Sequence, residues 1–292
     1  MSYTLKMSSL FFLNPSFVKD YLKLIRGVNL VLVGFTQYLT AIFLISEQQS
    51  WESIFLNKGF FLLVSATVMI TSAGYLINDY YDVKIDFINK PERVLVGKKL
   101  KRRWVIAGHT FLNLSAIAIG FYLSLKIGLI FLASAFLLWL YSNQLKRLPF
   151  VGNLAIALLT GMTLLLVAEY FNERTYVIAC YAIFAAFITL IREILKDMED
   201  MKGDERFGCK TLPIVFGIAT TKKILYLISV TFAITVFVLM SALSFYLPIL
   251  LGIALLWLNY GIFKADTVRA FQKLSTYCKV IMLFGVISMI WI

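Results

Sequence analysis

Nine apolar stretches limit the possible folds of this chain more than any other feature of its sequence. A bilayer core of about 30 Å needs a helix of about 20 mostly apolar residues. The expected spans lie near residues 27–45, 60–78, 104–123, 126–142, 152–170, 175–193, 224–244, 247–263 and 276–292. We therefore predict an all-α fold, an integral membrane bundle of nine transmembrane helices that forms a single domain over residues 1–292.

Composition and proline placement agree with this prediction. Hydrophobic residues make up 60% of the 292 residues and charged residues only 15%, whereas a soluble domain of this size needs a more charged surface. All five prolines fall outside the expected spans or at their edges, since helix interiors tolerate proline poorly. The boundary between the third and fourth spans is the least marked, because only Lys126 and Gly128 indicate it.

The basic residues predict an orientation. All but three of the 28 lysines and arginines lie in the N-terminal segment, in the loops after the second, fourth, sixth and eighth spans, or at adjoining span ends. The exceptions are Lys58, Lys126 and Arg174. The positive-inside rule then places the N-terminus in the cytoplasm. The net charge of +12 reflects this topology and contact with anionic membrane lipids. No nucleic-acid motif accompanies it, so we expect no nucleic-acid partner.

Two acidic trios follow the second and sixth spans with identical spacing. The trios are Asp79, Asp82 and Asp86 in the first and Asp197, Asp200 and Asp204 in the second. Each member of the second trio lies 118 residues after its counterpart, which suggests an internal duplication. On a helix, positions i, i+3 and i+7 fall within about 60° of one another, so each trio forms a carboxylate stripe about 10 Å long. We call these the first and second stripes.

Carboxylates at this spacing repel one another, and charge near the membrane is costly, so a cation should compensate them. Two stripes facing each other would suit Mg²⁺, which prefers octahedral oxygen ligands completed by substrate phosphates. The alternative is that solvated loop acids pair with nearby lysines. Ten of the 16 acidic residues lie within 79–92 and 193–205, which favours the metal interpretation.

Basic and polar residues share the cytoplasmic side with the stripes. Arg26 opens the first span, Asn78 precedes the first stripe, Arg93 follows it in NKPERVLVG, and Lys146 follows the fourth span in YSNQLKRLP. Cationic side chains beside metal-bound carboxylates suit a diphosphate leaving group. Topological positive charge is the alternative explanation, and it fits the cluster from Lys98 to Arg103 better.

Together these motifs resemble those of the UbiA superfamily of intramembrane prenyltransferases. NDYYDVKIDFINKPER is similar to that family's first aspartate motif, YSNQLKRLPFVGN to its Tyr-Ser-x-x-Lys segment, and KDMEDMKGDERFGCKTLP to its second aspartate motif. The resemblance covers essentially the whole chain. One departure is VLVG after Arg93, where many relatives have Arg-Pro-x-x-x-Gly, so the conformation of this loop does not follow from the resemblance.

The resemblance implies Mg²⁺-dependent transfer of an isoprenyl group from a polyprenyl diphosphate to a lipid-soluble acceptor. It implies that all six aspartates bind metal, with catalytic roles for Asp82, Asp86, Asp200 and Asp204. Substrate contacts are implied for Asn78, Arg93 and Lys146, and we add Arg26 from its position. Tyr141 is a candidate for stabilising an allylic cation with its aromatic face. The active site would face the cytoplasm of a prokaryotic plasma membrane.

The acceptor stays open between two classes. REILKDMEDMKGDERFGCKTLPIVFG looks most similar to the branch of digeranylgeranylglyceryl phosphate synthases, whose acceptor is geranylgeranylglyceryl phosphate. Enzymes that prenylate an aromatic acceptor, such as 4-hydroxybenzoate or a naphthoate in quinone biosynthesis, share the metal motifs.

Two other classes of membrane protein fit the sequence less well. A CDP-alcohol phosphotransferase would need a DGxxAR motif, which the sequence lacks. A membrane transporter would place its acidic residues at mid-membrane rather than at span ends. Three scattered cysteines and the single His109 suggest neither a disulfide framework nor a zinc site.

Overall fold

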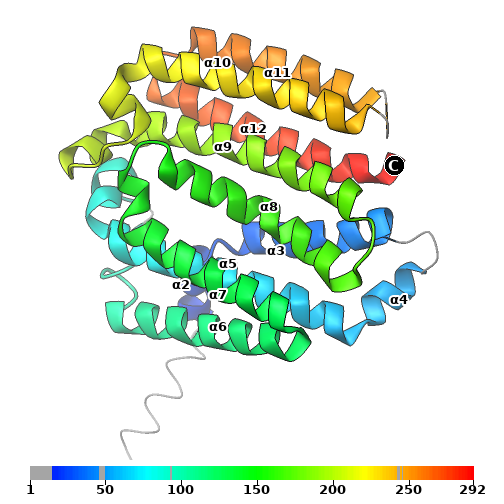
Figure 1. Ribbon diagram of the computed structural model, residues 1–292. Helices are drawn as coiled ribbons and strands as arrows, with labels where there is room; N and C mark the ends of the chain where they lie inside the picture. Colours follow the sequence, from blue (N-terminus) through cyan, green and yellow to red (C-terminus); the bar gives the residue numbers. More distant parts are fainter. Residues whose placement is uncertain (1–14, 46–49, 93, 242–243, 245) are drawn as a thin grey trace, which may run out of the picture. The chain divides into compact units, whose positions relative to one another are not determined.

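A computed structural model describes residues 15–45, 50–92, 94–241, 244 and 246–292 of the chain, with side chains described from Val18 onward. These residues form helices and no β-strand (Figure 1). The helices are α2 (Pro15–Leu24), α3 (Gly27–Thr40), α4 (Trp51–Leu56), α5 (Lys58–Asn89), α6 (Arg102–Leu123), α7 (Leu125–Asn143), α8 (Val151–Phe171), α9 (Thr175–Arg206), α10 (Leu212–Met240), α11 (Tyr246–Lys264) and α12 (Val268–Ser288). Shorter turns are η1 (Ala41–Ile45), η2 (Leu145–Arg147) and η3 (Met289–Trp291).

The expected number of spans is confirmed. Within the described residues, nine helices are long and apolar enough to cross a membrane. The first combines α3 with the π-helical turn η1, and the last combines α12 with η3. Ser124 interrupts the chain between α6 and α7 with an extended backbone, so the least marked boundary is also a real one. The direction in which the spans cross the membrane stays a prediction.

Some helix boundaries differ from the predicted ones. The sequence places the seventh span at 224–244, whereas α10 begins at Leu212. The apolar pattern is interrupted after its first turns by Thr220, Thr221, Lys222 and Lys223. The Lys222 ammonium is held by the carbonyl of Phe263 at 3.2 Å and the carboxylate of Asp266 at 3.0 Å. Gly217 kinks α10 with a φ of 77°, a backbone conformation that glycine adopts without strain.

The described chain packs as two compact units. Unit 1 contains Met1–Gly34 and Ser65–Ser142, and unit 2 contains Phe35–Val64 and Asn143–Ile292. The boundary falls inside α3 and α5. The first stripe belongs to unit 1 and the second to unit 2, and the single-domain organisation stays a prediction.

In unit 1, the loop after α5 folds back onto the helix that precedes it. Leu95, Val96 and Leu100 are buried in one cluster with Leu24 of α2 and Leu76 of α5. The loop is closed by backbone bonds, since the carbonyl of Leu95 accepts three N–H groups from residues 98–100. This packing gives the VLVG segment its conformation and places it beside the first stripe.

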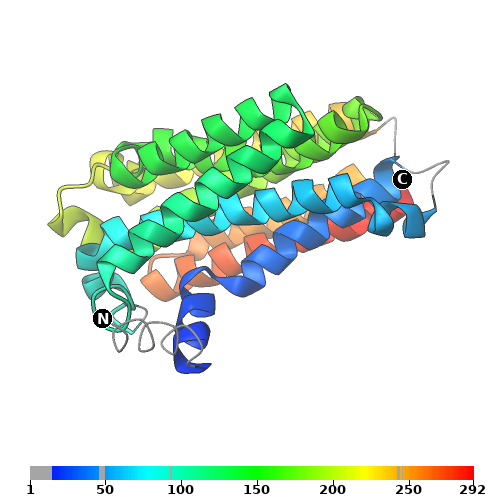
Figure 2. The same cartoon turned by 90° about the horizontal axis from the view of Figure 1, so that it is seen from below.

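Close helix packing also joins α6 to α7, which neighbour each other in Figures 1 and 2. A Cβ atom added at Gly120 would lie 2.6 Å from the Phe131 ring and 3.0 Å from the Gly128 Cα atom. The two glycines therefore let the hairpin close tightly.

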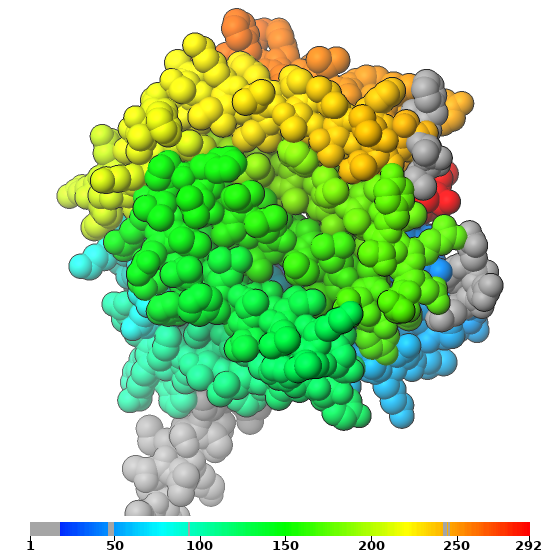
Figure 3. Space-filling model, in the orientation of Figure 1, coloured from blue at the N-terminus to red at the C-terminus, as the bar shows by residue number. Residues whose placement is uncertain are grey.

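In unit 2, α9 packs against α8, α10 and α12 (Figure 1). A Cβ atom at Gly161 of α8 would lie 2.9 Å from the Ala182 carbonyl of α9, so the two helices approach closely there. By contrast, α10 and α11 expose large apolar side chains such as Phe237, Leu256 and Trp257. Their surface is drawn in yellow and orange in Figure 3. Apolar outward faces are those that lipid, rather than water, would solvate.

Candidate functional site

The first stripe lies on the last turns of α5. Asn78, Asp79, Asp82 and Asp86 are all half-buried there, because α5 continues without a break to Asn89. The helical spacing predicted from the sequence is therefore present, with about 10 Å of rise from the first carboxylate to the last.

Arg26 contacts the first stripe directly. Its guanidinium lies 3.1 Å from Asp79 Oδ1 and 4.5 Å from the centre of the Tyr75 ring. The backbone of Arg26 has a φ of 55° where the chain passes from α2 to α3. Asn29 donates to the Tyr75 hydroxyl at 3.4 Å. Sequence reasoning selected Arg26 but missed Tyr75, whose only signal is its position one turn before Asp79.

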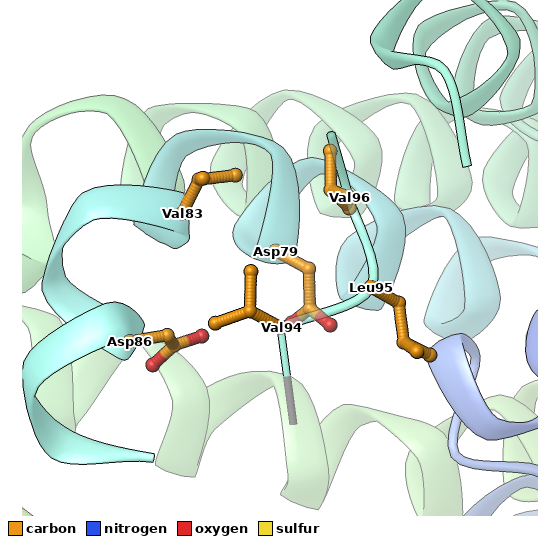
Figure 4. A pocket seen from close by; sticks show the side chains of 6 residues that line it. All are labelled: Asp79, Val83, Asp86, Val94, Leu95 and Val96. Atoms are coloured by element: carbon orange, nitrogen blue, oxygen red, sulfur yellow. The ribbon is translucent and has the colours of Figure 1, made fainter. Parts of the chain in front are cut away.

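A pocket separates the two ends of the stripe (Figure 4). It is lined by Asp79, Val83 and Asp86 of α5 and by the loop residues 94–96. In Figure 4 the carboxylates of Asp79 and Asp86 lie on either side of Val94. Apolar side chains thus flank both carboxylates, which limits the water that competes with a bound cation.

The second stripe lies on the last turns of α9. Asp197, Asp200 and Asp204 are half-buried there. One turn earlier, Glu193 is buried and forms two ion pairs. Its Oε1 atom accepts a hydrogen bond from Arg192 at 2.6 Å, and its Oε2 atom accepts one from Lys196 at 2.8 Å. Both oxygens of Glu193 already have cationic partners, which suits a structural ion pair.

Asp197 has a different kind of partner. The amide nitrogen of Asn153 donates to Asp197 Oδ2 at 2.8 Å, and Asn153 is only 6% exposed. Asn153 lies in the first turn of α8 and is the last residue of the YSNQLKRLPFVGN segment. The sequence motif included this residue, but its contact with a residue 44 positions away could not be inferred from spacing.

Lys146 lies half-buried in η2, close against the start of α8. A Cβ atom at Gly152 would lie 2.8 Å from both the Leu145 carbonyl oxygen and the Lys146 Cα atom. The carbonyl of Arg147 accepts the backbone N–H of Lys210 at 2.8 Å, which ties η2 to the segment after α9.

The two remaining predicted site residues are Tyr141 and Arg93. Tyr141 lies half-buried in the last turn of α7, and it belongs to unit 1 whereas Lys146 belongs to unit 2. Arg93 lies outside the described residues. The structure therefore joins Arg26 to the first stripe and Asn153 to the second.

Among the described residues, no three His, Cys, Asp or Glu side chains are grouped closely enough to hold a metal ion by themselves. The reason is geometric, since a stripe at i, i+3 and i+7 spreads its carboxylates along the helix. Mg²⁺ needs few protein ligands, because water and phosphate oxygens complete its shell. The half-buried carboxylates of each stripe have the donor chemistry that such an ion requires.

A protein-family model settles what kind of protein carries this arrangement. The model of the UbiA prenyltransferase family matches residues 37–284. The chain belongs to this family. The UbiA match begins before the first stripe and ends after the second, so both lie within it. The chain is thus a prenyltransferase and, with its nine apolar helices, an integral membrane protein.

Individual UbiA relatives agree with this assignment. A digeranylgeranylglyceryl phosphate synthase of Methanosphaera stadtmanae is 30% identical over 282 residues, which cover 93% of this chain and 98% of the relative. A solved structure described as digeranylgeranylglyceryl phosphate synthase in membranes has a TM-score of 0.71 at 24% identity, covering 94% of this chain and 97% of that one. A UbiA homologue from Archaeoglobus fulgidus, bound to GPP and Mg²⁺, has a TM-score of 0.63 at 16% identity, with coverages of 94% and 100%. Both structures show that the UbiA fold is shared.

Proposed function

We propose that this UbiA protein transfers a geranylgeranyl group from its diphosphate to geranylgeranylglyceryl phosphate, in a Mg²⁺-dependent reaction. The observation that carries this proposal is the 30% identity to a digeranylgeranylglyceryl phosphate synthase over nearly the full length of both chains. The Mg²⁺ and the prenyl diphosphate bound to the Archaeoglobus fulgidus homologue support the metal and the donor class.

Each stripe has a role in this proposal. The carboxylates of Asp79, Asp82 and Asp86 in one unit, and those of Asp197, Asp200 and Asp204 in the other, supply oxygen ligands for Mg²⁺. Mg²⁺ held by these carboxylates would neutralise charge on the diphosphate, which would make it a better leaving group. Asn78, Lys146 and Arg93 hold phosphate oxygens, and Arg26 completes the positive charge beside Asp79.

In the proposed reaction, one bond breaks and one bond forms at C1 of the prenyl chain. The bond between C1 of the prenyl chain and the diphosphate oxygen breaks, and the electron pair leaves with the diphosphate. The hydroxyl oxygen of the acceptor forms a bond to C1 and loses its proton. The aromatic face of Tyr141 stabilises the positive charge that develops on the allylic group. Apolar helices accommodate the two prenyl chains, which explains why the reaction takes place in a membrane fold.

Topology and organisation belong to the same proposal. The basic loops support a cytoplasmic N-terminus and an active site facing the cytoplasm of a prokaryotic plasma membrane. The family match crosses both units, which supports a single functional domain over residues 1–292.

A comparison of three acceptors, each supplied separately, tests the proposal. Purified protein in detergent receives Mg²⁺, geranylgeranyl diphosphate, and one of three acceptors: geranylgeranylglyceryl phosphate, 4-hydroxybenzoate or dihydroxynaphthoate. We expect diphosphate release and a prenylated product, identified by its mass, with geranylgeranylglyceryl phosphate and with neither aromatic acceptor. Chelation of Mg²⁺ with EDTA should stop the reaction, and added Mg²⁺ should restore it. Prenylation of an aromatic acceptor in place of the glyceryl phosphate would overturn the assignment.

A further inference from the structure

We infer that Asn153 is a positioning residue for the second stripe: its amide holds one oxygen of Asp197 and leaves the other directed to a divalent cation. This inference rests on the proposed Mg²⁺-dependent function. The bond from Asn153 Nδ2 to Asp197 Oδ2 is 2.8 Å long, and Asn153 is 6% exposed. A nearly buried amide at this distance constrains both the rotation and the depth of the carboxylate.

Asn153 differs from the partners of Glu193 because its amide is uncharged. Glu193, one turn earlier on α9, is bonded by Arg192 and Lys196, so its charge is compensated by protein cations. A neutral amide orients Asp197 without compensating its charge. A divalent cation would therefore supply the positive charge that the amide does not, while Lys196 is bonded to Glu193.

The position of Asn153 is itself fixed by backbone packing. Gly152 allows η2 to contact the first turn of α8, and the N–H of Leu154 bonds to the carbonyl of Phe150 at 2.9 Å. Asn153 thus sits on a rigid helix start rather than on a loop. The Asn153 side chain thus links α8 to the second stripe on α9. It also links the preceding turn η2, which carries Lys146, to that stripe.

Metal binding measured without turnover tests the inference. Full-length protein in detergent is titrated with Mn²⁺ and followed by electron paramagnetic resonance, with no donor present. We expect Asn153→Ala to weaken Mn²⁺ binding by about tenfold or more, as is usual when a partner of a ligating carboxylate is removed. In turnover assays the KM for Mg²⁺ should rise, while kcat at saturating Mg²⁺ should stay within about threefold of the wild type.

Two controls separate positioning from a merely structural role. Asn259→Ala, on α11 of the same unit, should leave Mn²⁺ binding unchanged. If Asn153→Ala does not fold, Asn153→Ser carries the test, because its shorter side chain cannot reach Asp197 and should also weaken binding. A folded Asn153 variant that binds Mn²⁺ as tightly as the wild type would overturn the inference.

The same Mn²⁺ measurement distinguishes failure of the inference from failure of the proposed function. The wild type should bind Mn²⁺, and Asp197→Ala should lose most of that binding. Wild-type protein that binds no Mn²⁺ would overturn both the metal-dependent function and the inference. Binding that depends on Asp197 but not on Asn153 would overturn the inference alone.

Discussion

Two kinds of carboxylate share the last turns of α9, and their partners distinguish them. Glu193 is buried and bonded by two cationic side chains, whereas Asp197 is held by the neutral amide of Asn153. Removing a buried ion-pair partner leaves an uncompensated charge, so Glu193 should matter for stability. The stripe carboxylates, by contrast, should matter for metal binding and catalysis.

The central aspartates of the two stripes should be essential for turnover. Asp82→Ala and Asp200→Ala each remove a half-buried carboxylate from a helix end, so we expect loss of diphosphate release by at least about a hundredfold. The thermal unfolding midpoint should change little, because relief of repulsion within the stripe offsets lost contacts.

A matched acid outside the stripes provides the control. Asp266 pairs with Lys222 and its side chain is 80% exposed, so Asp266→Ala should retain diphosphate release within about twofold. Full activity in both stripe variants would contradict the assigned site.

Glu193→Gln should lower stability and leave the Mg²⁺ dependence of turnover unchanged, in contrast to the stripe variants. The change leaves Arg192 and Lys196 without their anionic partner, which we expect to lower the free energy of unfolding by up to about 3 kcal/mol. The Mg²⁺ concentration needed for half-maximal turnover should stay the same. Thermal unfolding in detergent and a Mg²⁺ titration measure the two effects, and a changed Mg²⁺ dependence in a stable variant would place Glu193 in the metal site instead.

Local spacing in the sequence determines which of these residue-scale features could be predicted. The two stripes could be predicted because i, i+3 and i+7 positions must share a helix face. Arg26 could be selected because it lies at a span end beside polar residues. The contact between Asn153 and Asp197 could not be predicted, because it depends on how α8 packs against α9. The ion pairing of Glu193 was equally hidden, since its neighbours in sequence include both basic and acidic groups.

Among the elements, the position of the turn η2 depends on one glycine at the start of the next helix. Gly152 brings the backbone of η2 against the start of α8, and the bond from Lys210 to Arg147 fixes its other side. Lys146 is carried on this turn. The position of a proposed phosphate ligand therefore depends on the absence of a side chain at residue 152.

Gly152→Ala should consequently affect both stability and activity. A Cβ atom there would lie 2.8 Å from two backbone atoms of η2, so the turn must move. We expect the free energy of unfolding to fall by about 2 kcal/mol and the KM for the prenyl diphosphate to rise, because Lys146 moves with the turn.

Gly252→Ala on α11 is the matched control for this change. Nothing lies within 4 Å of a Cβ atom there, so the variant should unfold at or above the wild-type temperature. Equal thermal stability and equal KM for Gly152→Ala and Gly252→Ala would show that η2 has room to adjust.

Helix extents show where hydropathy fails as a predictor. The sequence marks the apolar part of each span, but α5 and α9 continue through their stripes, and α10 begins 12 residues before its predicted start. Charged residues within a helix lower the local hydropathy without ending the hydrogen-bonded backbone. The kink at Gly217 is likewise a backbone property that hydropathy does not report.

For the whole molecule, the membrane fold was the most predictable feature. Apolar runs of about 20 residues have few alternatives to spanning a bilayer, and nine such helices are present in the described part of the chain. The division into two units was not predicted, because contacts between distant segments define it. Boundaries between the units fall inside α3 and α5, where the sequence carries no linker.

Orientation can be tested with single cysteines at opposite ends of one helix. Lys101 caps the start of α6 and Lys126 follows its end, and both residues are exposed. Lys101→Cys should be protected from a membrane-impermeant maleimide in intact cells, whereas Lys126→Cys should be labelled. The three native cysteines are buried, so their background labelling should be low. The reverse pattern would contradict the predicted topology.

The length of α5 links catalysis to the lipid around the protein. Its 32 residues rise through roughly 48 Å at about 1.5 Å per residue, against a hydrocarbon core of about 30 Å. The helix is thus about 18 Å longer than the core, and its last turns, which carry the first stripe, extend beyond the hydrocarbon. Because helices tilt to match bilayer thickness, the depth and angle of the stripe should change with acyl-chain length. Turnover in vesicles of graded chain length should therefore pass through an optimum, whereas a flat profile would mean that the stripe is held independently of the bilayer.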